Sequence, residues 1–149
     1  MEQNAGVGKY IFRFGLVHLA ILVGLSIVFT ILEIESNSGV TIAALIGAAA
    51  AAVSKFIQDN KRAPNSSEKT KLVWLSYLVS WVVSLALAGI FFYLSNEGGQ
   101  LIEAMKSIDL AIIIGIVALV SVFYLGALSL AYGYMARKQF DGMQKKGKI

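Results

Sequence analysis

The stretch Lys55–Lys71, KFIQDNKRAPNSSEKTK, is the only long polar interruption between the apolar segments of this chain, and it carries five of the thirteen Lys and Arg residues. Pro64 disfavours helical backbone in the residue before it, so the preceding helix should end there. Asn65 stands three residues before Glu68, close to the pattern of a capping box at a helix N-terminus. The stretch therefore predicts a loop that ends one helix, begins another near Ser66, and divides the chain into two helical hairpins.

The composition indicates that lipid, rather than water, surrounds most of the protein. Of the 149 residues, 57% are hydrophobic and only 15% are charged, whereas a soluble domain has about a quarter charged residues. The length suits one domain, residues 1–149. The absence of cysteine excludes disulfides and thiolate metal sites. No catalytic triad, nucleotide-binding glycine motif or zinc signature is present, so we expect no enzyme activity, no cofactor and no metal site.

The apolar segments on both sides of the central loop are long enough for transmembrane helices, which need about 20 apolar residues each. The predicted spans cover about residues 10–32, 40–57, 66–94 and 108–136. The first is longer than the ~7–15 apolar residues of a signal peptide, so we expect it to be retained. A short amphipathic turn is expected within 101–108, and the basic tail 137–149 is expected to fray at its end. The predicted fold is all-α, a four-helix transmembrane bundle.

The distribution of charge predicts the orientation of these helices. The N-terminal segment, the central loop and the tail carry twelve of the thirteen Lys and Arg, and the two turns on the other side carry only Lys106. Cytoplasmic loops of membrane proteins are enriched in Lys and Arg, so both termini should be cytoplasmic. The net charge of +4 is confined to segments that flank apolar runs. We therefore expect contact with acidic lipid headgroups and no nucleic-acid partner.

Small residues recur every fourth position on the third and second predicted helices. The two sets are Ser76, Ser80, Ser84 and Ala88 on the third helix, and Ala43, Gly47 and Ala51 on the second. Small residues at this spacing let helix backbones approach closely in a membrane, where packing and hydroxyl hydrogen bonds hold them together. We expect these faces to pack against other helices. The other interpretation is a hydroxyl-lined pathway.

His18 and Trp81 are polar groups expected inside the membrane. An ionisable residue in a transmembrane helix is a functional hypothesis by default. The alternative is a neutral imidazole hydrogen-bonded to a serine, a tyrosine or a carbonyl of another helix, and we favour it because no carboxylate is expected inside the hydrocarbon core to pair with it or relay a proton. The indole N–H of Trp81 needs a partner, so this residue could mark a contact with another helix or subunit.

The stretch GVTIAALIGAAAAAVSKFIQDNKRAPNSSEKTKL, residues 39–72, combines an Ala-rich helix, Phe56, the sequence Arg62-Ala63-Pro64 and Glu68, and a helix with repeated serines follows it. In these features the chain resembles an uncharacterised family of small four-helix inner-membrane proteins from Gram-negative bacteria. The resemblance implies a bacterial inner-membrane location and the same four-helix topology. It implies no activity.

These observations predict a small non-enzymatic membrane protein that acts through helix contacts, either as an accessory subunit of a membrane complex or as a homo-oligomer. One alternative is an oligomeric transporter or channel in which His18 and the Ser76/Ser80/Ser84 face line a path. A second alternative is immunity or protection against a membrane-acting toxin, which requires only a bundle that contacts the toxin in the bilayer.

Overall fold

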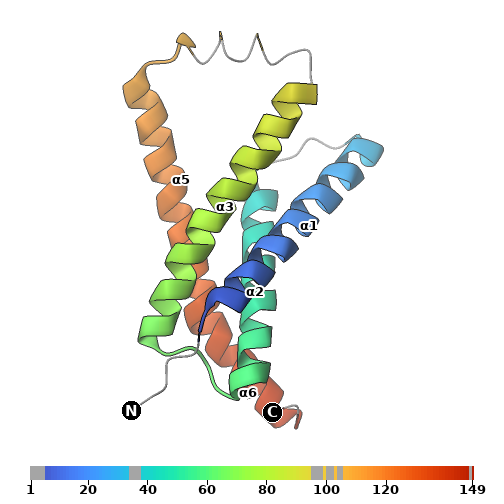
Figure 1. Ribbon diagram of the computed structural model, residues 1–149, viewed down its shortest axis with the longest axis vertical. Coiled ribbons are helices and arrows are strands. Elements are labelled where there is room, and N and C mark those ends of the chain that lie inside the picture. The colour runs from blue at the N-terminus through green and yellow to red at the C-terminus, as the bar shows by residue number, and fades with distance from the viewer. Residues whose placement is uncertain (1–5, 34–37, 95–98, 100–102, 104–105, 148) are drawn as a thin grey trace.

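The protein is a bundle of long helices, seen in a computed structural model that describes residues 6–33, 38–94, 99, 103, 106–147 and 149 (Figure 1). Its elements are α1 (Gly8–Leu32), α2 (Ser38–Asn60), α3 (Ser66–Leu94), α5 (Leu110–Leu130), the π-helix η1 (Ala131–Met135) and α6 (Ala136–Lys145). Four helices are long and apolar enough to cross a membrane, the last being the continuous helix Leu110–Lys145. The predicted fold class is confirmed, and the chain is a multi-pass membrane protein.

The start of α3 is fixed by a reciprocal capping box. The backbone N–H of Glu68 donates to Oδ1 of Asn65 at 2.9 Å, and the backbone N–H of Asn65 donates to Oε2 of Glu68 at 2.9 Å. Two backbone donors at the helix terminus are thereby satisfied. As predicted, α3 covers residues 66–94, while α2 extends at both ends beyond the predicted 40–57.

The last helix runs past its predicted end at residue 136. It continues through η1 and α6 to Lys145, so most of the basic tail is helical. Phe140 and Met143 of α6 pack against the hydrophobic core, and this burial stabilises a helical segment within the tail that the sequence predicted only as basic and frayed at its end. The amphipathic turn predicted within 101–108 lies largely outside the described residues.

The core occupies only one end of the bundle, the end that holds the start of α1, the loop between α2 and α3, and α6 (Figure 1). Toward the other end α1, α3 and α5 diverge. Among the described residues, α1 has no buried residue after His18, α3 has none after Ser80, and α5 has none before Leu128. We call this divergent part, residues 19–32, 81–94 and 110–127, the open half.

The rest of the described bundle, which contains the core, is called the packed half, and helix α2 is its central element. It packs against α1, α5, η1 and α6. Its small residues Ala44, Ala48 and Ala52 are buried, and their size lets neighbouring backbones come close. Larger side chains fill the space between helices near the loop, with Phe56 and Ile57 fully buried.

Candidate functional site

A buried ion pair lies at the loop end of the core. Nη1 of Arg62 is 2.7 Å from Oε2 of Glu68, and Nη2 is 2.8 Å from Oε1. This two-pronged geometry is the strong form of an arginine–carboxylate pair. The side chain of Glu68 is 1% exposed, while that of Arg62 is 32% exposed. The guanidinium carbon also lies 5.6 Å from the centre of the Phe56 ring, within the range of a cation–π contact.

A second polar cluster joins the start of α1 to the end of α2. Lys9 and Lys55 each place Nζ 2.8 Å from the carboxylate of Asp59. The Tyr10 hydroxyl donates to Oδ2 of Asp59 at 3.3 Å and accepts from Nδ2 of Asn60 at 2.8 Å. Exposed ion pairs contribute little stability, so we interpret this network as setting the register between the two helices.

The π-helix η1 is joined to α3 by a buried hydrogen bond. The hydroxyls of Ser76 and Tyr132 are 2.7 Å apart, and both residues are buried. π-Helical turns are rare and frequently lie at functional sites. Here the π-helical turn brings the Tyr132 side chain into the core against α3. The role of the turn that the structure shows is therefore packing.

The predicted serine face of α3 is buried at its loop end. Ser76 and Ser80 are fully buried, and Ser84 and Ala88 are half-buried. The Ser80 hydroxyl donates to the backbone oxygen of Tyr77 at 2.7 Å. Helix α3 packs mainly on α1 and α5, but the partners of the Ser76 and Ser80 hydroxyls are Tyr132 of η1 and the backbone of α3 itself.

The predicted ridge on α2 takes a different position. Ala43 and Gly47 are exposed and Ala51 is half-buried. A Cβ on Gly47 would lie 3.4 Å from a methyl group of Ile21, so this position faces α1 rather than α3. The buried small residues of α2 begin one position later, at Ala44.

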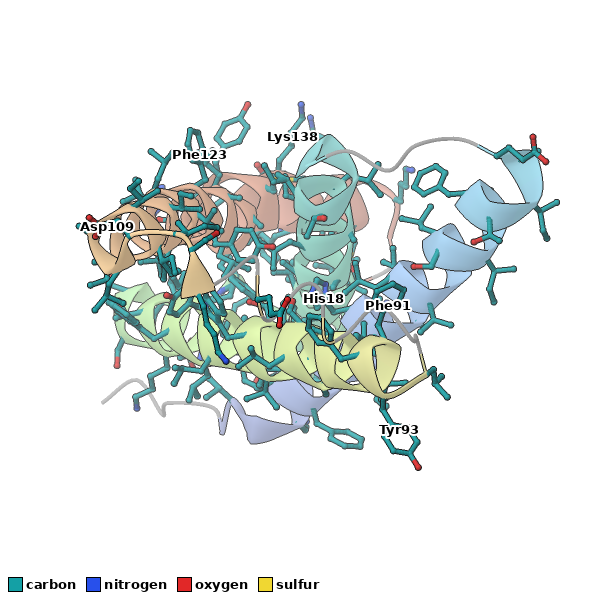
Figure 2. All side chains as sticks on the ribbon, turned by 90° about the horizontal axis from the view of Figure 1, so that it is seen from above. His18, Phe91, Tyr93, Asp109, Phe123 and Lys138 are labelled. Atoms are coloured by element: carbon teal, nitrogen blue, oxygen red, sulfur yellow. The ribbon has the colours of Figure 1, made fainter. Side chains whose placement is uncertain are left out.

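His18 is fully buried near the middle of the bundle (Figure 2). Its ring stacks on Phe14 with the centroids 5.5 Å apart. Neither ring nitrogen forms a hydrogen bond with good geometry in the described part of the chain, although the backbone of Ala44 lies close enough to act on the ring electrostatically. The serine or tyrosine partner expected from the sequence is not at the imidazole, and of the expected partners it is a backbone group of another helix, that of Ala44 on α2, that lies near the ring.

Trp81 lies on α3 one turn beyond Tyr77, and its ring meets the tyrosine edge-on with the centroids 6.4 Å apart. The residue is half-buried. Its buried indole Nε1 has no hydrogen-bond partner among the residues that the structure describes. A contact of Trp81 with another subunit stays a prediction.

In the part of the chain that the structure describes, the open cavities between helices include the following three. One of about 350 Å³ is lined by Ser66, Lys69, Thr70, Val73, Trp74 and Ser129; one of about 360 Å³ by Ser54, Gln58, Gln139, Gly142, Met143 and Lys146; and one of about 460 Å³ by Thr41, Ile42, Leu119, Val120, Phe123 and Tyr124. The third is mostly apolar, and the first has a cation beside hydroxyl groups. No motif in the sequence marks Lys69, but its spacing along α3 with Ser66, Val73 and Trp74 places all four on one helix face.

No known family model, no curated protein and no solved structure matches this chain. The resemblance of residues 39–72 to small inner-membrane proteins of Gram-negative bacteria therefore stays a prediction.

Proposed function

We propose that this protein is a non-enzymatic integral membrane protein that acts through helix contacts made by its open half, as a homo-oligomer or as an accessory subunit. The observation that carries the proposal is the one-sided core: all fully buried residues of the described chain lie in the packed half. In the open half, α1, α3 and α5 diverge (Figure 1), so each presents faces that none of the other described helices covers.

Exposure of apolar side chains alone does not favour a partner, because lipid tails are as apolar as leucine. The glycines of the open half give a more specific argument. A Cβ added at Gly24, Gly89, Gly115 or Gly126 would meet no atom within 4 Å. Small residues on exposed helix faces in a membrane favour close approach of another helix. We therefore expect a partner helix to pack against these positions.

Cross-linking tests this interface directly, since the chain has no native cysteine. In native membranes, Leu85→Cys in the open half should form cross-linked adducts with a short bis-maleimide. Phe12→Cys, exposed to a similar degree but in the packed half, should form few. An adduct of twice the chain mass indicates a homo-oligomer, and any other adduct mass identifies an accessory role. Equal yields at the two positions, or a monodisperse monomer after mild extraction, would contradict the proposal.

The proposal includes an orientation with both termini and the central loop in the cytoplasm of a bacterial inner membrane. It rests on the positive-inside distribution and on the resemblance of residues 39–72. Ser67→Cys and Lys106→Cys test it, because both positions are exposed and lie on opposite sides in the proposed topology. In intact cells, an impermeant maleimide should label Lys106→Cys only. Labelling of Ser67→Cys alone would reverse the orientation.

A transporter or channel is the second candidate function, and it is favoured by the buried imidazole of His18, whose nitrogens form no well-aligned hydrogen bond with the described residues. Buried polar groups without partners are rare and call for an explanation. The serines of the predicted path are less favourable, because the hydroxyls of Ser76 and Ser80 already have partners. Proteoliposomes that move no ion or cationic drug, with His18→Ala equal to wild type in cells, would remove this candidate. Protection against a membrane-acting toxin stays a prediction, which the neighbouring genes would test.

A further inference from the structure

We propose that the cavity between α3 and α5 binds the phosphate group of an anionic phospholipid. This cavity has a volume of about 350 Å³ and is open to the surroundings. Ser66, Lys69, Thr70, Val73 and Trp74 line it from α3, and Ser129 lines it from α5. It lies at the end of α3 next to the basic central loop, which in a membrane is the level of the headgroups.

The side chain of the cavity's cation passes close to a glycine of the π-helix. A Cβ on Gly133 would lie 2.9 Å from Nζ of Lys69 and 3.1 Å from its Cε. The missing side chain of Gly133 therefore leaves room for the end of the lysine beside η1. Lys69 is half-buried, and its ammonium group lies at the junction of α3 and η1.

The charge of Lys69 has no counterion within the described residues. Lys9 and Lys55 share the carboxylate of Asp59, and Arg62 is paired with Glu68. Lys69 takes part in none of these pairs. A half-buried ammonium group gains from an anion supplied from outside, and phosphate is an anion that lysine commonly binds.

Two hydroxyl groups of the cavity are also free to donate. Ser66 and Ser129 form no side-chain hydrogen bond in the part of the chain that the structure describes, whereas the Thr70 hydroxyl already donates to the backbone oxygen of Ser66 at 2.9 Å. A phosphate beside Lys69 could therefore accept from the ammonium group and from these serine hydroxyls.

The order of residues along α3 favours a lipid over a free phosphate. The polar residues of the cavity, Ser66, Lys69 and Thr70, come first, and Val73 and Trp74 follow one turn deeper in the bundle. Trp74 is 52% exposed, as is usual for tryptophans in the interfacial belt. This polar-to-apolar gradient matches a headgroup followed by its acyl chains, whereas a soluble phosphate would need only the polar end.

Native mass spectrometry of the full chain in mild detergent tests the site, with phosphatidylglycerol and phosphatidylcholine added in turn. We expect one phosphatidylglycerol to bind more tightly than phosphatidylcholine. Lys69→Gln should weaken that binding about tenfold, the equivalent of one charge-assisted hydrogen bond. Lys71→Gln is the matched control, because it makes the same charge change on the same helix but does not line the cavity.

A second variant changes the volume of the cavity without changing the charge of Lys69. Ser129→Leu fills the cavity from α5 and leaves Lys69 in place, so it should also weaken phosphatidylglycerol binding. Equal binding by Lys69→Gln and Lys71→Gln, or equal binding of both lipids to the wild type, would overturn the proposal. Inorganic phosphate distinguishes the two sources of phosphate: no displacement of lipid at millimolar concentrations is expected, and a Lys69-dependent displacement would assign the site to a soluble phosphate.

Discussion

Replacement of Arg62 by alanine should lower the free energy of unfolding by about 3–5 kcal/mol, because it leaves the carboxylate of Glu68 buried without its partner. The side chain of Glu68 is 1% exposed and accepts two hydrogen bonds from the guanidinium group. The variant also loses the contact of the guanidinium with the Phe56 ring. Reversible unfolding in mixed micelles, followed by circular dichroism or by tryptophan fluorescence, measures the loss.

The double variant Arg62→Ala/Glu68→Gln separates the buried charge from other effects. Glutamine removes the charge but can still serve in the capping box with Asn65, so the double variant should recover most of the stability lost by Arg62→Ala. Glu68→Gln alone should lower the free energy of unfolding less than Arg62→Ala does. The arginine side chain that it leaves without a carboxylate is 32% exposed and reaches solvent. A double variant as unstable as Arg62→Ala would show that the loss comes from the arginine contacts and not from the unpaired carboxylate.

Local sequence signals were sufficient to predict where α3 begins and how many long apolar helices the chain forms. The capping box of Asn65 and Glu68 depends on residues three apart, so the sequence contains its whole cause. The same spacing did not reveal that Glu68 is buried, because burial depends on how α3 packs against the rest of the bundle. The central loop holds two acids, Asp59 and Glu68, among five cations, and this composition alone does not show which cation pairs with which acid.

Features that depend on distant contacts could not be predicted in this way. The π-helix places Tyr132 opposite Ser76, 56 positions earlier in the chain, and no local pattern encodes that pair. The helix of the basic tail depends on Phe140 and Met143 packing on the core. On α2, alanines occupy 43 and 44 and also 48 to 52, so composition could not show which ridge is buried. The structure buries the one that includes Ala44 and Ala48.

His18→Leu should raise the free energy of unfolding by about 1–3 kcal/mol, since that is the usual cost of a buried polar group without a hydrogen bond. From the sequence alone, the imidazole was expected to bond to another helix, and its loss would then destabilise the bundle. In the structure neither nitrogen has a well-aligned hydrogen bond among the described residues, so the substitution removes a desolvated polar group and loses at most a poorly aligned contact with the backbone of Ala44. Leucine keeps an apolar contact with Phe14, the residue on which the imidazole stacks.

His18→Gln is the control for this effect, because it keeps a polar group at the same place and should give no comparable gain in the free energy of unfolding.

The same two variants also test whether His18 has a function. Residues that carry function are often those whose replacement increases stability, since activity needs groups that packing alone would not select. If His18 lines a path, His18→Leu should be more stable than wild type and inactive in flux. If His18→Leu is instead less stable, the imidazole has a hydrogen-bond partner within the bundle, and the backbone of Ala44 on α2 would be that partner.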